Sequence, residues 1–315
     1  MKFSLTARPP FNFRSVIQSH GWVQLAPCRY DEATASFTYV DRLPSGRVIE
    51  YRVSESADGV QAQTEPLTKP ELAGAKDRVR WMFGLDADFS AFYQATRKEP
   101  KLRHASRLAR GRMLRSPTLF EDVIKTILTT NTLWGATKRM TLNLINEFGE
   151  PFTGGLDAPR TARGYSTTVA TTTHETTELK RAFPTPESIA ASSPDVLREK
   201  VRVGYRAPAI HELATRVASG EFDLEALKTS SLSTLELRKE LLKINGVGPY
   251  AAANLLLILG RPDFIPVDSW ALKLVSHEWY RGETVTAKEV EKRFEKWGEF
   301  RGFAFWFWDW KYNGN

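Results

Sequence analysis

A tight turn between two apolar segments is the part of this sequence best suited to hold a phosphate. Asn245-Gly246-Val247-Gly248 separates a helix expected over residues 235–244 from a second helix that begins at Pro249. A Gly-x-Gly turn that feeds a helix N-terminus presents backbone N–H groups to one point, where the helix dipole also favours an anion. Pro249 has no N–H to give. The predicted donors are the backbone groups of Gly246, Val247, Gly248 and Tyr250. An ordinary helical hairpin with a glycine turn is the plainer interpretation.

An acidic residue between apolar neighbours follows the turn by about twenty residues. Asp268 comes after Val267 and just before an expected helix, so its carboxylate is well placed to act as an N-cap. A carboxylate can also stabilise a developing positive charge or orient an attacking water molecule. Taken alone, an Asp in this position is more often a cap than a catalyst, and the nearby turn is what favours the catalytic interpretation.

Flat side chains are numerous enough to line a pocket for a planar ligand. The 9 Trp and 18 Phe residues accompany a formal net charge of +7 and a pI of about 9.4. Aromatic and basic residues together are what a protein uses to stack bases and hold phosphates. Most aromatic side chains of residues 303–310 are expected in the core, and one or two at the pocket. The candidates for its walls are Trp134, Tyr250, Trp270 and Trp306, with His20-Gly21-Trp22 as a looser suggestion.

Basic residues concentrate between Arg97 and Arg115, where eight Lys and Arg residues stand against Glu99 alone. This excess favours a polyanionic partner, and a solvated helix face explains it equally well.

Several classes of protein are excluded by composition. The single cysteine, Cys28, cannot form a disulfide framework, a Cys-rich zinc site or a four-thiolate iron–sulfur cluster. We therefore predict no metal site. The sequence has no run of 18 apolar residues and no secretory leader pattern, so no membrane partner is expected and the cytoplasm is the predicted location.

Two predicted domains must position these residues. Residues 1–75 form an N-terminal α/β domain, with strands at 37–43 and 47–53 around Pro44-Ser45-Gly46, a hairpin at Asp58-Gly59 and a connector over 64–75. Residues 76–315 form a helical domain, with a helix start at Ser116-Pro117. Residues 153–180 are predicted as a mobile insertion, because they are rich in Thr, Ser, Gly and Ala. Further helix starts are Thr185-Pro186, Ser193-Pro194, Ser233 with Glu236, and Thr286 with Glu289.

Together these features resemble the helix-hairpin-helix (HhH-GPD) DNA glycosylase superfamily, in the branch of 3-methyladenine DNA glycosylase II and 8-oxoguanine DNA glycosylase. The resemblance covers nearly the whole chain apart from the Thr-rich insertion. It implies an α+β fold with a mainly α-helical glycosylase core and a small N-terminal antiparallel β domain like the TATA-binding protein. The residues that carry it are Leu242-x-x-x-Gly246-Val247-Gly248-x-x-x-Ala252, Val267-Asp268, Val203-Gly204-Tyr205-Arg206-Ala207 and the segment 116–131.

The resemblance also implies a function. The protein is expected to excise an alkylated or oxidised purine in base excision repair, by flipping the base out of the duplex and hydrolysing its N-glycosidic bond with help from Asp268. By family position, Asn131 and Asn254 are expected near the base. The expected partner is double-stranded DNA that contains a damaged base, and the expected state is a monomer. No cofactor is expected beyond a monovalent cation that the hairpin is able to hold. The expected location is then the nucleoid in a bacterium or the nucleus in a eukaryote.

One departure from the family pattern concerns the nucleophile. Tyr250 stands where lyase-competent subfamilies carry a lysine. A phenol cannot form an imine, so water is expected to attack the sugar and the lyase step to be absent. The missing cluster cysteines argue against the endonuclease III and adenine-mismatch branches. Two alternatives stay open: a non-catalytic damage-sensing module, or a bifunctional glycosylase/lyase that uses Lys243 or Lys273.

Overall fold

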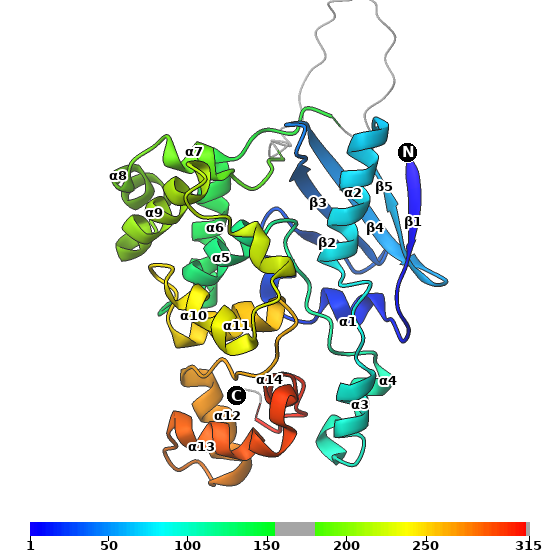
Figure 1. The fold of residues 1–315 in the computed structure, drawn as a ribbon, viewed down its shortest axis with the longest axis vertical. Helices are drawn as coiled ribbons and strands as arrows, with labels where there is room; N and C mark the ends of the chain where they lie inside the picture. The colour runs from blue at the N-terminus through cyan, green and yellow to red at the C-terminus, as the bar shows by residue number, and fades with distance from the viewer. Residues whose placement is uncertain (155–179, 313–315) are drawn as a thin grey trace, which may run out of the picture.

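The computed structural model describes residues 1–154 and 180–312. The predicted insertion at 153–180 therefore lies outside the described residues except at its ends. Figure 1 shows the N-terminal sheet on one side of the molecule, with most of the helices beside and below it. Among the described residues, no helix has both the length and the apolar character needed to cross a membrane.

The sheet has five antiparallel strands in the order β1-β5-β4-β3-β2. The predicted turn at Pro44-Ser45-Gly46 and the hairpin at Asp58-Gly59 are confirmed, and Gly46 has the positive φ of +88° that its turn requires. The strands are β1 (Lys2–Thr6), β2 (Arg29–Asp31), β3 (Ser36–Arg42), β4 (Val48–Ser56) and β5 (Gly59–Gln63).

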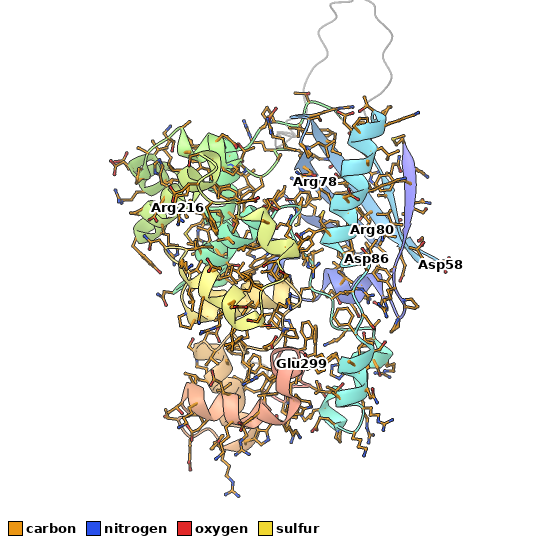
Figure 2. All side chains as sticks on the ribbon, viewed as in Figure 1. Asp58, Arg78, Arg80, Asp86, Arg216 and Glu299 are labelled. Carbon is orange, nitrogen blue, oxygen red and sulfur yellow. The ribbon has the colours of Figure 1, made fainter. Side chains whose placement is uncertain are left out.

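Helix α2 (Lys69–Met82) lies over the sheet, where a connector was expected (Figure 1). That expectation was wrong because Thr68 and Glu71 form a capping box, each side chain bonding to the other's backbone N–H. Arg78 on α2, labelled in Figure 2, pairs with Asp41 on β3 at 2.8 Å. The helix runs across the predicted domain boundary between residues 75 and 76, and that boundary stays a prediction.

The other helices begin mostly where the sequence predicts. Thr185 and Ser193 are N-caps, and the boxes at Ser233 and Thr286 are both formed. The α-helices are α1 (Phe13–Ile17), α3 (Ser90–Thr96), α4 (Arg103–Arg107), α5 (Leu119–Thr129), α6 (Trp134–Phe148), α7 (Pro186–Ala190), α8 (Pro194–Val196), α9 (Ala207–Ala218), α10 (Thr234–Leu242), α11 (Pro249–Ile258), α12 (Ser269–Trp279), α13 (Ala287–Phe294) and α14 (Arg301–Trp306). Shorter turns are η1 (Gly21–Gln24), η2 (Pro100–Leu102), η3 (Leu197–Val201), η4 (Gly204–Arg206), η5 (Glu225–Thr229) and η6 (Glu295–Phe300).

Helix α5 starts later than expected. Its N-cap is Thr118, whose side chain accepts a hydrogen bond from the N–H of Glu121, so the prediction of a start at Ser116 was wrong. Ser116 is buried instead, and its hydroxyl accepts a hydrogen bond from Lys125. The residue thus joins a polar cluster inside the protein.

Two apolar cores meet near the predicted site. One core runs from the sheet through α5 to α11, and the second holds α12 to α14 together with Phe92 of α3. The second core contains Phe303, Phe305, Phe307 and Trp308, as expected for most of the C-terminal aromatic residues. The glycine turn of the hairpin precedes α11, a helix of the first core. Asp268 precedes α12, a helix of the second core.

The basic stretch is partly internal. Arg112 is 3% exposed and donates to four backbone carbonyls, and Arg115 lies over the ring of Trp81 at 4.2 Å. These two cations hold the fold together and are not part of a solvated face. Arg97 and Arg103 are exposed, as expected for residues on a solvated helix face.

Candidate active site

The predicted hairpin is formed by α10 and α11, and its two glycines have different roles. Gly246 has a φ of +83°, which favours glycine, and an added Cβ would lie 3.1 Å from the Cβ of Ala209. Gly248 is the N-cap of α11, with an extended backbone and no atom within 4 Å of an added Cβ. The turn therefore depends on Gly246, whereas Gly248 leaves the approach to the helix N-terminus open.

The hairpin keeps three of its four predicted donors. The N–H of Val247 donates to the carbonyl of Ile244 at 3.0 Å, so its prediction as an anion donor was wrong: the turn itself uses that group. Among the described residues, the N–H groups of Gly246, Gly248 and Tyr250 have no backbone or side-chain acceptor. Ala251, also in the first turn of α11, adds a fourth free N–H that the sequence reading missed.

We call the depression beside this turn the hairpin groove; it measures about 730 Å³. It runs between the hairpin, the segment 129–132 after α5, Tyr205 and Asp268. Asn131 lies here, exposed and with a φ of +46°, and its side-chain amide donates to the hydroxyl of Tyr205 at 3.3 Å. Asn131 was predicted in the base pocket, but the structure places it in this open groove.

A smaller, more enclosed space lies beside the groove. This aromatic cavity measures about 240 Å³. Four of the predicted pocket residues line it together with Asp268: Trp134, Tyr250, Asn254 and Trp306. The suggested His20-Gly21-Trp22 also reaches it. The remaining lining residues are Met113, Thr129, Thr132, Thr137 and Ile258.

Trp270 does not reach the aromatic cavity. Its side chain is 43% exposed and packs against Tyr312, with ring centroids 5.4 Å apart. Residues two apart on a helix point in different directions, so closeness to Asp268 in sequence did not bring the indole to the same face. Its prediction as a pocket residue is corrected accordingly.

Each indole around the cavity is held by one hydrogen bond from its ring N–H. Trp22 donates to Asp122, Trp134 to the side chain of Gln24, and Trp306 to the carbonyl of Ser19, each at 2.8 Å. These three bonds fix the orientation of the rings in the cavity wall. A Cβ at Gly21 would stand 2.5 Å from the ring of Trp134, so glycine is required for this packing.

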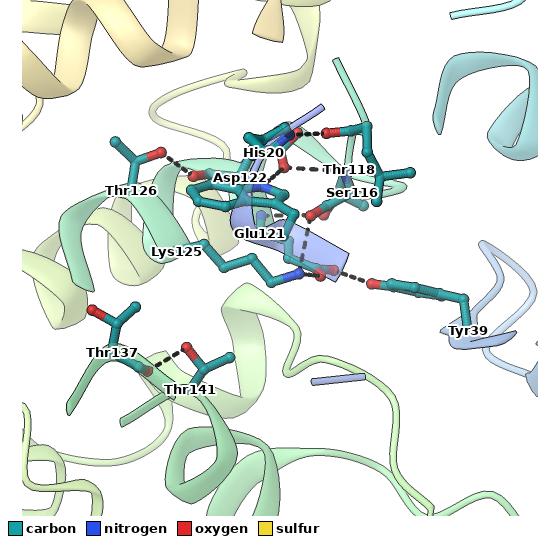
Figure 3. Close-up of polar contacts among 12 residues, drawn as sticks. His20, Tyr39, Ser116, Thr118, Glu121, Asp122, Lys125, Thr126, Thr137 and Thr141 are labelled. Carbon is teal, nitrogen blue, oxygen red and sulfur yellow. Dashed lines mark hydrogen bonds and ion pairs between the residues drawn. The ribbon is translucent and has the colours of Figure 1, made fainter. Parts of the chain in front are cut away.

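A buried charged cluster on α5 is joined to the cavity wall through Trp22, and Figure 3 shows the polar contacts of this cluster. Asp122 accepts hydrogen bonds from Trp22 and from the N–H of Ser116, and burial raises its pKa to about 6. Lys125 pairs with Glu121 at 2.6 Å, and Glu121 also accepts a hydrogen bond from Tyr39 of the sheet. The sequence analysis did not predict this cluster, although Glu121, Asp122 and Lys125 stand within the apolar stripe of α5 and indicate buried charges.

Asp268 lines both the groove and the cavity. One carboxylate oxygen, Oδ1, accepts the N–H of Ala271 at 2.7 Å and caps α12. The other oxygen has no hydrogen-bond partner among the described residues. The cap and a catalytic role are therefore compatible in one side chain. Tyr250 also lines both spaces, and burial, followed by the charge of Asp268, raises the pKa of its phenol.

No group of three or more His, Cys, Asp or Glu residues suited to a metal ion occurs in the described parts of the chain.

Comparison with known proteins agrees with this geometry. The family model for HhH-GPD superfamily base excision DNA repair proteins matches residues 124–300, which include the hairpin and Asp268. That segment is more than half of the chain. The chain belongs to the HhH-GPD superfamily, the helix-hairpin-helix DNA glycosylases of base excision repair. The match leaves out His20, Trp22 and Trp306 of the cavity wall.

Solved structures of HhH-GPD proteins share the fold. MBOgg1, in complex with a low-affinity DNA ligand, is 26% identical with a TM-score of 0.69, over 96% of this chain and 91% of that one. The 3-methyladenine DNA glycosylase from Archaeoglobus fulgidus is 19% identical with a TM-score of 0.70, over 98% and 96%. The Clostridium acetobutylicum 8-oxoguanine glycosylase/lyase is 21% identical with a TM-score of 0.67, over 94% and 91%. The predicted α+β architecture is confirmed.

Two Bacillus subtilis proteins are similar in sequence. DNA-3-methyladenine glycosylase is 24% identical over 235 residues, which cover 71% of this chain and 68% of that protein. YfjP is 27% identical over 124 residues, which cover 39% of this chain and only 42% of YfjP.

Proposed function

We propose that this HhH-GPD protein is a monofunctional DNA glycosylase that releases an alkylated or oxidised purine from duplex DNA by hydrolysis. The observation that carries the proposal is the junction of the groove and the cavity, where Asp268 has a free carboxylate oxygen and Tyr250 stands in place of a lysine. The relatives named for 3-methyladenine and 8-oxoguanine support damaged purines as the substrate class.

The groove is suited to the DNA backbone. The free N–H groups of Gly246, Gly248, Tyr250 and Ala251 converge where the dipole of α11 is positive, which favours a phosphate. Backbone donors carry no sequence information, so this contact positions any duplex equally well.

The cavity is suited to the extruded base. A target base must leave the stack before its glycosidic bond can be reached. The fixed faces of Trp22, Trp134 and Trp306 offer flat surfaces against which a purine can stack. This arrangement brings the sugar of the flipped nucleotide to the opening, where Asp268 lies.

Asp268 then acts on the sugar. As the base departs, positive charge develops on the ring, and the carboxylate stabilises it and orients the incoming water. One charge pair at about 4 Å, with an effective dielectric of about 20, is worth roughly 4 kcal/mol. That corresponds to about a thousandfold in rate. The departing base must supply the rest of the acceleration by leaving readily or by being bound tightly as it leaves.

The alternatives have less support. No lysine lines the groove or the cavity within the described residues. Lys243 is exposed and paired with Glu240 at 2.7 Å, Lys273 is exposed on α12, and Lys125 is buried in its pair with Glu121. A non-catalytic damage sensor would have no use for a free carboxylate oxygen at the cavity mouth.

The test uses the wild-type protein and a panel of duplexes, each with one alkylated or oxidised purine. Base release should leave an intact strand that breaks only after alkali treatment, and borohydride should trap no protein–DNA adduct. A trapped adduct would assign an amine nucleophile and contradict hydrolysis. Binding of the damaged duplexes without release of any base would support the damage sensor instead.

A further inference from the structure

His20 brings a ring with two distinct nitrogens to the wall of the aromatic cavity. Its Nε2 lies 2.6 Å from the carbonyl oxygen of Leu114. A carbonyl can only accept, so this nitrogen carries the proton. Nδ1 has no hydrogen-bond partner among the described residues, and it keeps some solvent exposure on a ring that lines the cavity. In a neutral imidazole that second nitrogen is an acceptor.

The ring stays neutral at physiological pH. Burial lowers the pKa of His20 to about 4; the bond to Leu114 raises it in part, and the charge of Lys125 lowers it further. The lone pair on Nδ1 is therefore available to accept a hydrogen bond at neutral pH.

The position of the ring is fixed from several sides. It packs against Trp22, with ring centroids 4.7 Å apart and a tilt of 56°. The preceding residue, Ser19, accepts the N–H of Leu114 at 2.9 Å through its hydroxyl and the indole N–H of Trp306 at 2.8 Å through its carbonyl. A fixed acceptor of this kind can discriminate among ligands without reorganising.

Most other polar hydrogens around the cavity are already used, although the hydroxyls of Thr132 and Tyr250 donate to no described residue. The indole N–H groups of the three tryptophans point to Asp122, Gln24 and Ser19. The hydroxyls of Thr129 and Thr137 donate to backbone carbonyls. The amide of Asn254 donates to the carbonyl of Tyr250 at 3.1 Å, which leaves the amide oxygen of Asn254 as a second acceptor. Nδ1 of His20 and the amide oxygen of Asn254 are therefore the acceptors that this wall holds for a ligand that brings its own N–H donors.

We propose that Nδ1 of His20 accepts a hydrogen bond from an exocyclic amino group on the extruded base, and so makes aminopurines the preferred substrates of this cavity. This inference rests on the proposed function, because it requires the damaged base to enter the aromatic cavity. A base that lacks the amino group would bind less well. It would displace the water on Nδ1 of His20 without offering that nitrogen a hydrogen bond in exchange.

The experiment compares two lesions that differ in one group. 7-Methyladenine carries the amino group, and 7-methylpurine is the same cationic base without it. The wild-type protein should release 7-methyladenine about tenfold faster than 7-methylpurine from matched duplexes under single-turnover conditions, after correction for the spontaneous loss of each base. His20→Phe keeps a flat ring but has no acceptor, so it should release both bases at similar rates. His20→Gln, which can donate to Leu114 and still present an oxygen, should recover part of the preference.

Equal release of the two bases by the wild-type protein, or an unchanged preference in His20→Phe, would overturn the inference. Absence of release from every lesion would instead remove the proposed function. A readout that needs no activity and no variant is the ¹⁵N spectrum of the histidine rings. His20 should show a protonated Nε2 and an unprotonated Nδ1, and the Nδ1 resonance should shift when free 7-methyladenine is added, but not with 7-methylpurine. A protonated Nδ1 in the free protein, or no shift, would exclude the acceptor role.

Discussion

The hairpin groove and the aromatic cavity lie side by side but are lined by different chemical groups. The groove presents backbone N–H groups around two glycines, on an exposed turn. The cavity is made of side chains, and its three indoles are each fixed by a hydrogen bond. Asp268 and Tyr250 are shared by both. In the proposed function this difference separates two tasks: the backbone of the groove holds any DNA, and the side chains of the cavity choose the base.

The largest effect should come from the shared carboxylate. Asp268→Asn keeps an oxygen for the N–H of Ala271 but loses the charge, so base release should fall about a thousandfold while DNA binding is retained. Asp268→Ala also loses the cap, and should lower stability by about 1 kcal/mol in addition. Single-turnover release, DNA titration and thermal unfolding of both variants separate the two roles. Normal activity of Asp268→Asn would remove this residue from the mechanism.

A pH-dependent stability difference is expected from Asp122 in the buried charged cluster on α5. The pKa of Asp122 is about 6 in the folded protein, above its usual value of 3.8, so the folded state binds the proton more tightly than the unfolded state does. Stability gained from this proton is present below about pH 4 and is lost as pH rises through 6. Relative to Asp122→Asn, which cannot titrate, the wild-type protein should lose up to about 3 kcal/mol across that window. Urea unfolding at pH 4 to 7 checks the trend; parallel curves for the two proteins would contradict it.

The groove should respond to charge without regard to the lesion. Gly248→Asp adds a negative side chain where a phosphate is expected, and nothing within 4 Å resists the new Cβ. Binding to damaged and undamaged duplexes should weaken about a hundredfold alike. Gly74→Asp on α2, equally unobstructed, is the matched control for the charge change. The log–log salt slope should also decrease in magnitude in Gly248→Asp. A loss confined to damaged DNA would mean that the groove is not a general backbone site.

The smallest change should come from narrowing the cavity. Gly21→Ala places a Cβ against the ring of Trp134, so the indole must move. The ratio of release rates for two purine lesions of different size should change by about tenfold, because a displaced wall alters the fit of each base. Affinity for undamaged duplex should stay the same, since the groove is untouched. An unchanged ratio would show that Trp134 does not contact the base.

Sequence alone located the features whose signals are local. The hairpin, its glycines and the cap at Asp268 are read from neighbouring residues, and each was found. The cavity was predicted only in part: its aromatic residues were named, but Met113, Thr137 and Ile258 were not, because the meeting of distant segments depends on packing. Trp270 was included as an available flat side chain, but its indole is exposed and packs against Tyr312 instead. The error at Val247 has a similar origin, since composition cannot show that a turn already uses its N–H.

The short segment from Ser19 to Gln24 binds Trp306 of α14 and Trp134 of α6, and its Trp22 binds Asp122 of α5. This segment and Trp306 lie outside residues 124–300, which hold the hairpin and Asp268. In the proposed function the hairpin and Asp268 carry the reaction, whereas part of the wall that selects the base comes from residues outside the family match. On that proposal, changes in the segment from Ser19 to Gln24 would alter which damaged base is preferred while the hairpin and Asp268 stay the same. The same segment is where protein engineers would change residues to alter the preference for a damaged base.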